Sequence, residues 1–210
     1  MNENFIPAAH YHFLTPVYEW LARPFIGRTW DAIAKETSKL APKGSSIIDI
    51  GCGPGTVLRH IRQKRPDLRL RGFDIDPAIV NIAKQKTQGL EIDFAEASID
   101  SIPLADQSVD LVINNMVFHH LPTQTKLATF SEVKRVLKPN GSFLLCDFSM
   151  LKEDRISFSL LAFFSKLIEP EVIPQLEGQL FEMAKESHAT VKTLRTFYGC
   201  IALHHFQFPH

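Results

Sequence analysis

The chain has 210 residues, of which 45% are hydrophobic and 22% charged, and its 23 basic and 23 acidic residues give no formal net charge. A chain of this size buries enough surface for one core, so we expect one structural domain. The lack of a basic excess argues against DNA or large RNA as a partner, because nucleic acids usually bind to a basic face.

The cysteines and the N-terminus bear on the cellular compartment. Cys52, Cys146 and Cys200 are odd in number and widely spaced, which is typical neither of a disulfide framework nor of a zinc site. The first residues are polar and acidic, unlike the basic start of a secretory signal. The sequence also contains no run of about 18 apolar residues. We therefore expect a cytoplasmic protein without a transmembrane segment.

Residues 5–40 have a helical, amphipathic pattern that carries many aromatic side chains. We expect helices here that are broken at Pro16, Pro24 and Gly27. Residues 1–43 would then form an N-terminal helical cap on the domain. Part of this cap would act as a lid over a ligand site, and the alternative is plain packing of its aromatic side chains.

From residue 44 onwards, strand patterns and helix patterns alternate. Strands are predicted at 47–50, 68–73, 90–94, 109–113 and 143–146, and helices at 54–64, 77–83 and 127–137. This alternation predicts an α/β fold with a doubly wound, mostly parallel sheet. Residues 44–210 would form this ligand-binding domain.

The pattern changes after Asp147. Residues 152–187 are predicted to form a helical insertion, with an apolar helix at 156–168 and an amphipathic helix at 175–187. Residues 190–208 alternate around Tyr198-Gly199, which indicates a C-terminal hairpin. The apolar helix suits a cover over a hydrophobic ligand, a dimer interface, transient membrane contact or ordinary burial.

A predicted buried strand with one acid runs into three glycines at alternate positions, in the segment Asp49-Ile50-Gly51-Cys52-Gly53-Pro54-Gly55. Glycines allow a sharp turn and let a ligand approach the backbone N–H groups. In an open parallel sheet, ligands bind beyond the carboxyl ends of the strands. Asp74 ends the second strand about 20 residues after this glycine turn, where it can accept both hydroxyls of a ribose. Asp76 looks instead like a helix N-cap.

Two kinds of nucleotide cofactor suit such a turn. A dinucleotide site has glycine at its first, third and sixth positions, but the sixth position counted from Gly51 is Thr56. A short-chain hydride-transfer enzyme would also need a tyrosine with a lysine one helical turn later, and no tyrosine of this chain has one. An NAD-dependent oxidoreductase is therefore the weaker alternative.

Four motifs in order carry a resemblance to a known family. They are Asp49-x-Gly51-x-Gly53-x-Gly55, Gly72-Phe73-Asp74, IPLADQSVDLV at 102–112 and RVLKPNG at 135–141. Together they resemble class I S-adenosylmethionine-dependent methyltransferases, most closely the branch of the ubiquinone/menaquinone-type small-molecule enzymes. Segment 14–18 and the C-terminal hairpin are also similar to small-molecule members. Asn140 replaces a glycine that is usual in the last motif, and asparagine tolerates the left-handed turn expected there.

The resemblance implies a Rossmann-like sheet of seven strands in the order 3-2-1-4-5-7-6, with the last strand antiparallel. It implies S-adenosylmethionine as cofactor, S-adenosylhomocysteine as product and no metal. The residues implied to bind the cofactor are Asp49, Gly51, Cys52, Gly53, Asp74, Ile75, Glu96, Ala97, Ser98 and Asn114. Glu96 and the Ala97 N–H would bind the adenine, although the family more often has aspartate at the position of Glu96.

Methyl transfer is an in-line displacement that needs a base only where the acceptor must lose a proton. His119 and His120 lie just beyond the fourth predicted strand and are the candidate bases, since histidine titrates near neutral pH. The alternative is that they only cap the following loop. The candidate substrate or lid residues in the N-terminal cap are Tyr11, His12 and Tyr18.

We therefore expect a methyltransferase that acts on a small, hydrophobic acceptor, as a monomer or a homodimer. A regulator that binds S-adenosylmethionine without catalysis remains open, because the glycine turn and Asp74 would serve both functions.

Overall fold

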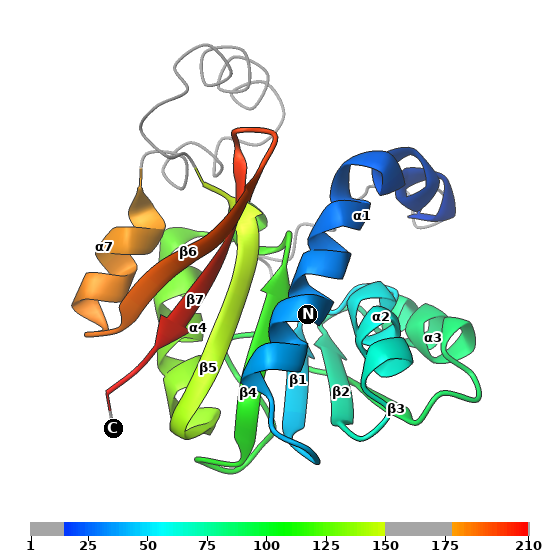
Figure 1. Ribbon diagram of the computed structural model, residues 1–210, viewed down its shortest axis with the longest axis horizontal. Helices are drawn as coiled ribbons and strands as arrows, with labels where there is room; N and C mark the ends of the chain where they lie inside the picture. Colours follow the sequence, from blue (N-terminus) through cyan, green and yellow to red (C-terminus); the bar gives the residue numbers. More distant parts are fainter. Residues whose placement is uncertain (1–14, 150–177, 210) are drawn as a thin grey trace.

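The computed structural model describes residues 15–149 and 178–209. Within these ranges, seven strands form one sheet in the order β3-β2-β1-β4-β5-β7-β6 (Figure 1). The strands β1 to β5 pair in parallel, and β7 is antiparallel to both β5 and β6. The strands are β1 (Ser46–Ile50), β2 (Arg69–Asp74), β3 (Ile92–Glu96), β4 (Val109–Asn115), β5 (Leu137–Phe148), β6 (Thr190–Phe197) and β7 (Ile201–Gln207). The predicted fold class and strand order are confirmed.

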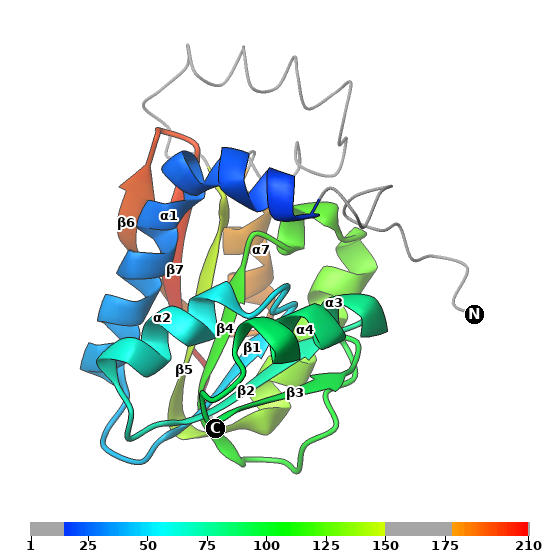
Figure 2. The ribbon, with the colours of Figure 1, turned by 90° about the vertical axis from the view of Figure 1, so that its right-hand side faces the viewer.

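Helices cover both faces of the sheet (Figure 2). The helices are α1 (Thr15–Leu40), α2 (Thr56–Lys64), α3 (Pro77–Lys86), the short 3-10 helix η2 (Phe118–His120), α4 (Thr123–Val136) and α7 (Gln179–Glu186). The first three supply side chains to the core on one face, and α4 and α7 supply the core on the other face. No helix in the described ranges is both long and apolar enough to span a membrane.

The central strand β1 shows why its sequence is a continuous apolar run. Ile47 packs into the core beneath α1 and α2, whereas Ile48 and Ile50 pack into the opposite core. A strand that is covered on both faces has no solvent-facing positions, so the apolar and polar alternation of a half-exposed strand disappears. The single acid in this run, Asp49, is consequently buried as well.

The helix α1 differs from the prediction. It is one helix from Thr15 to Leu40, so the breaks predicted at Pro24 and Gly27 are wrong. The break predicted at Pro16 stays a prediction, because the residues before Thr15 lie outside the described part of the chain. Pro16 lies in the first turn, where its missing N–H costs no hydrogen bond. Figures 1 and 2 show the N-terminal part of α1 at an angle to the rest, and an interior proline such as Pro24 bends a helix in this way.

The predicted bounds of two strands and one helix also differ from the observed ones. The third strand begins at Ile92, β5 extends from Leu137 to Phe148, and α7 begins at Gln179 after a left-handed Gly178. Asn140 has a φ of +64°, which confirms the left-handed turn predicted there. The apolar helix predicted at 156–168 lies outside the described residues.

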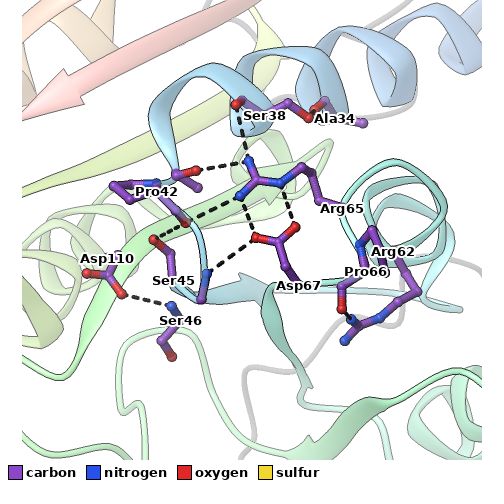
Figure 3. A network of polar contacts seen from close by, with 12 residues as sticks. Ala34, Ser38, Pro42, Ser45, Ser46, Arg62, Arg65, Pro66, Asp67 and Asp110 are labelled. Atoms are coloured by element: carbon purple, nitrogen blue, oxygen red, sulfur yellow. Dashed lines mark hydrogen bonds and ion pairs between the residues drawn. The ribbon is translucent and has the colours of Figure 1, made fainter.

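A polar network at the amino ends of β1 and β2 ties the end of α1 to the sheet (Figure 3). Arg65 pairs with both carboxylate oxygens of Asp67, with Nε–Oδ1 and Nη2–Oδ2 distances of 2.8 and 2.7 Å. Its guanidinium also donates to backbone carbonyls at the end of α1, those of Ser38, Ala41 and Pro42. The last carbonyls of a helix have no partner within the helix, so Arg65 supplies one. The hydrogen bond from Arg65 lowers the pKa of the Asp67 carboxyl.

Candidate functional site

The strand register brings the predicted cofactor residues to one edge of the sheet. In β1 and β2, Ile50 lies opposite Phe73, and in β2 and β3, Asp74 lies opposite Glu96. All these strands are parallel, so the residues that follow them share the carboxyl edge. As the sequence predicts, the carboxyl edge of the sheet therefore carries the glycine turn, Asp74, Glu96 and Asn114.

The glycine turn has backbone angles that favour glycine at each of its three positions. Gly51, Gly53 and Gly55 have φ values of +70°, +53° and +78°. The N–H groups of Gly51 and Cys52 donate to the Phe73 carbonyl at 2.8 and 2.9 Å. A Cβ atom at Gly51 would lie 2.7 Å from the Val117 side chain, whereas a Cβ atom at Gly53 would meet nothing within 4 Å.

The Asp74 carboxyl is fixed by the backbone of two turns. Its Oδ2 accepts the Gly53 N–H at 2.9 Å, and its Oδ1 accepts the Asp76 N–H at 3.1 Å. Burial raises the pKa of Asp74, and these hydrogen bonds act in the opposite direction. The side chain of Asp76 accepts the Ala78 N–H at 2.8 Å, which confirms its predicted role as N-cap of α3. Asp74 therefore holds the glycine turn in shape.

Two buried oxygens beside this turn have no hydrogen-bond partner among the described residues. They are Oδ1 of Asp49 and Oδ1 of Asn114. The amide nitrogen of Asn114 donates to the Ile50 carbonyl at 2.6 Å, which fixes the orientation of its side chain. Burial, and then the nearby Asp74 charge, raise the pKa of Asp49 well above its ordinary value. Buried polar atoms are normally hydrogen-bonded, so these two oxygens suit a ligand that carries N–H donors or positive charge.

The loop after β3 is more open. Glu96 is exposed and Ile75 is 37% exposed. The Ala97 N–H, predicted to donate to a ring nitrogen of adenine, donates to the Asp74 carbonyl at 3.0 Å. The Ser98 hydroxyl donates to Asp100. Of these residues, Ile75 and Glu96 have side chains that a ligand could reach without displacing a hydrogen bond described here.

The two histidines of η2 lie at the same edge, beyond β4. Nδ1 of His119 is 2.7 Å from Oδ1 of Asp147, which lies in β5, and His119 is only 5% exposed. The rings of His119 and His120 contact each other with centroids 3.9 Å apart. Burial is the main cause that lowers the pKa of His120 to about 4, and the neighbouring His119 is the second cause. His120 is therefore neutral at neutral pH.

Asp147 has no role in the sequence-based prediction. It is fully buried, and its Oδ2 accepts the Val117 N–H at 3.0 Å while its Oδ1 accepts the Phe148 N–H at 2.6 Å. Burial acts to raise the pKa of Asp147, but attraction to His119 and the hydrogen bonds from His119 and from the Phe148 N–H outweigh it and lower the pKa. The sequence offers one signal for Asp147, its position as an acid at the carboxyl end of a buried strand. Nothing in the sequence indicates that it pairs with a histidine 28 residues away.

The N-terminal lid residues are only partly placed. Tyr11 and His12 lie outside the described residues, and Tyr18 lies in α1 with its side chain outside the described part. Further along α1, the Thr29 hydroxyl donates to Oδ1 of Asn115 at 3.3 Å. This contact brings α1 to the carboxyl end of β4. No set of three or more potential metal-binding side chains comes together in the part of the chain that the structure describes.

Comparisons with known proteins agree with this arrangement. Residues 47–141 match a family model described as a methyltransferase domain. The ubiquinone/menaquinone biosynthesis C-methyltransferase UbiE of Bartonella bacilliformis is 29% identical over 203 residues, which cover 94% of this chain and 69% of that protein. The malonyl-[acyl-carrier protein] O-methyltransferase of Hahella chejuensis is 35% identical over 100 residues, which cover 48% of this chain and 35% of that protein. The chain thus spans about a third to two thirds of the length of these relatives.

A solved structure shows the same fold. A SAM-dependent methyltransferase from Aquifex aeolicus superposes with a TM-score of 0.64 at 20% identity, covering 83% of this chain and 88% of that chain. The motifs, the fold and these matches together define the class: the chain carries a class I S-adenosylmethionine-dependent methyltransferase domain. Within this class it lies close to the ubiquinone/menaquinone branch, as the sequence motifs predict.

Proposed function

We propose that this chain transfers a methyl group from S-adenosylmethionine to a small, hydrophobic acceptor. The observation that carries the proposal is a pair of buried oxygens beside the glycine turn, Asp49 Oδ1 and Asn114 Oδ1, which have no hydrogen-bond partner among the described residues. S-Adenosylmethionine has an ammonium group and a sulfonium, and either supplies the positive charge that a buried carboxyl lacks here. The residues present therefore suit this cofactor.

The remaining cofactor contacts follow from the same geometry. Gly53 leaves open space where any other residue would carry a Cβ atom, so a ligand can lie against the turn. Asp74 would accept the ribose hydroxyls, and its bond to the Gly53 N–H would keep its carboxylate oriented toward the turn. Glu96 and Ile75, from the loops after β3 and β2, would bind the adenine. Gly51, Cys52, Ala97 and Ser98 complete the proposed set.

When bound, S-adenosylmethionine supplies an activated methyl group that an acceptor takes by in-line displacement. The chain has to orient the acceptor and exclude water from it. The proposed cap, residues 1–43, would perform the second task together with residues 152–187. The contact between Thr29 and Asn115 supports this proposal, because it already holds α1 at the carboxyl edge.

The chemistry of the acceptor is the open part of the function. The two relatives are named for a C-methyltransferase of quinone biosynthesis and for an O-methyltransferase of an acyl-carrier protein, so their acceptors differ. The neutral net charge and the apolar segment predicted at 156–168 favour a small hydrophobic acceptor over a nucleic acid. The free cysteines suit the proposed cytoplasmic location.

Transfer of a radiolabelled methyl group tests the proposal. The full chain is incubated with methyl-labelled S-adenosylmethionine and a library of small phenols, carboxylic acids and amines, and label is measured in the organic extract. We expect transfer to at least one hydrophobic member, and less of it with Asp74→Ala. Tight binding of the cofactor without transfer to any member would instead favour a regulator that binds the cofactor without catalysis.

A further inference from the structure

The carboxylate of Asp147 and the ring of His119 form a buried pair at the edge where the cofactor site is proposed. Their Nδ1–Oδ1 distance of 2.7 Å is that of a charge-assisted hydrogen bond. Asp147 is ionised, so it accepts and does not donate, and the Nδ1 atom of His119 must carry the proton. The ring nitrogen Nε2 is then the basic one.

Asp147 has the properties of a residue that positions another. Two backbone N–H groups, those of Val117 and Phe148, fix its two oxygens. The Phe148 ring meets the His119 ring edge-on, with centroids 4.8 Å apart. The imidazole is therefore held in one orientation and one tautomer by groups from β5.

The position of the pair links it to the cofactor site. Val117, two residues before His119, lies against Gly51 so closely that a Cβ atom there would come within 2.7 Å of it. The η2 segment is thus packed on the turn that is proposed to hold the methyl donor. A base carried by this segment lies beside the same edge of the sheet.

We propose that His119, positioned by Asp147, is the base that takes a proton from the methyl acceptor, and that the acceptor is a weakly acidic hydroxyl compound. This proposal rests on the proposed function of the same site. The second histidine is the poorer base, because burial lowers the pKa of His120 to about 4. The ionised groups and histidines around His119 are Asp147 from β5, His120 from η2 and, beyond Asp147, His204 from β7.

The step balances in atoms and charge. The acceptor O–H proton moves to Nε2 of His119, and the freed electron pair forms the bond to the methyl carbon. The carbon–sulfur bond breaks and leaves its electron pair on sulfur. The positive charge of the sulfonium is lost as the imidazolium charge appears, and the Asp147 carboxylate stabilises that imidazolium.

A base of this kind discriminates between acceptor classes. A carboxylic acid is already ionised at neutral pH, so its methylation gains nothing from a base. A phenol-type hydroxyl has a pKa of about 10 and must lose its proton to react. The pair therefore indicates an acceptor of the second class.

Ionisation of a bound phenol probe tests the proposal without turnover. 4-Nitrocatechol changes its absorbance when it ionises, and it is titrated with pH in the presence of the full chain saturated with S-adenosylhomocysteine. We expect the bound probe to ionise about one pH unit lower with wild type than with His119→Asn, which corresponds to about tenfold in its ionisation constant. His119→Asn keeps an N–H donor for Asp147 and removes Nε2. Asp147→Asn should shift the midpoint in the same direction.

The control is a second histidine–aspartate pair outside the site. Nδ1 of His60 lies 3.5 Å from Oδ1 of Asp31, so His60→Asn makes the same change and should leave the midpoint of the probe unchanged. The proposal is overturned by an unchanged midpoint in His119→Asn, by a larger shift in His120→Asn, or by no binding of the probe beside S-adenosylhomocysteine. Calorimetry with S-adenosylhomocysteine on wild type and on each variant distinguishes failure of the His119 proposal from failure of the proposed function. If wild type does not bind S-adenosylhomocysteine, the proposed function itself fails.

Discussion

Two carboxyl groups at neighbouring strand ends are held in different ways. Asp74 is engaged by the N–H groups of Gly53 and Asp76, whereas Asp49 has a buried oxygen without a partner among the described residues. Burial raises the pKa of both, more strongly for Asp49. This difference separates a carboxyl that shapes the turn from one that we propose is paired by the cofactor, and each carboxyl leads to a prediction.

Asp74→Ala should weaken binding of S-adenosylhomocysteine. Loss of a charged acceptor costs about 1.5–3 kcal/mol, or roughly 10- to 150-fold in the dissociation constant measured by calorimetry. Asp93→Ala is the matched control, because Asp93 is an exposed acid in the adjacent strand β3. Equal affinities of Asp74→Ala and wild type would exclude Asp74 as a cofactor residue.

Asp49→Asn should gain stability relative to wild type as the pH rises. A carboxyl with a raised pKa keeps its proton in the folded chain but loses it in the unfolded chain above about pH 4, so wild type loses stability with rising pH. Asparagine does not titrate. As the pH rises above about 4, the free energy of unfolding of the variant should increase relative to that of wild type in urea titrations. A difference that is independent of pH would contradict the assigned burial.

At the scale of elements, the glycine turn and the η2 segment are packed on each other. Gly51 and Gly53 both have positive φ, but only a Cβ atom at Gly51 would strike Val117. Substitutions at the two positions therefore separate the packing of the turn from its contact with a ligand.

Gly51→Ala should lower the free energy of unfolding more than Gly53→Ala does. Both alanines carry the cost of a left-handed residue, about 1–2 kcal/mol, and Gly51→Ala adds the clash with Val117. Gly53→Ala, whose methyl group enters open space, should mainly reduce affinity for S-adenosylhomocysteine. Urea unfolding and calorimetry on both variants check this, and the opposite ranking in stability would refute the packing described here.

The network around Arg65 belongs to the same scale, because it joins the end of α1 to the first two strands (Figure 3). Arg65→Ala should lower the free energy of unfolding by about 1–2 kcal/mol, since it removes donors from several carbonyls. Arg65→Lys should recover only part of this loss, because lysine lacks the planar fork of the guanidinium.

The contribution of this network to stability should also depend on pH. Pairing with Arg65 lowers the pKa of Asp67, so the pair stabilises the fold above the ordinary aspartate pKa near 3.8 and ceases to do so as the pH falls below it. Arg69→Ala, at an exposed position of β2, is the control, and an equal loss there would contradict this role.

At the scale of the whole molecule, the strands and their order follow from the sequence to different degrees. The apolar runs around Ile48 and Val112 predict buried strands because both faces of the sheet are covered. The order of the strands follows only from the family resemblance, since local patterns do not specify which strands pair. The unbroken α1 was not predictable from Pro24, because packing on α2 and on the sheet outweighs the loss of one hydrogen bond.

The candidate site divides in the same way. The glycine turn and Asp74 belong to sequence motifs with a typical spacing, so they could be located from the sequence. The pair His119–Asp147 joins residues whose proximity depends on the register of β4 against β5 and on the path of η2. A contact of this kind is a property of the folded sheet and leaves no local pattern.

The proposed cofactor is tested most directly by a calorimetric titration of the full chain with S-adenosylhomocysteine and, separately, with NAD. We expect saturable binding of S-adenosylhomocysteine at one site per chain and no binding of NAD at the same concentrations. Binding of NAD in preference to S-adenosylhomocysteine would contradict the proposed methyltransferase function and restore the oxidoreductase alternative.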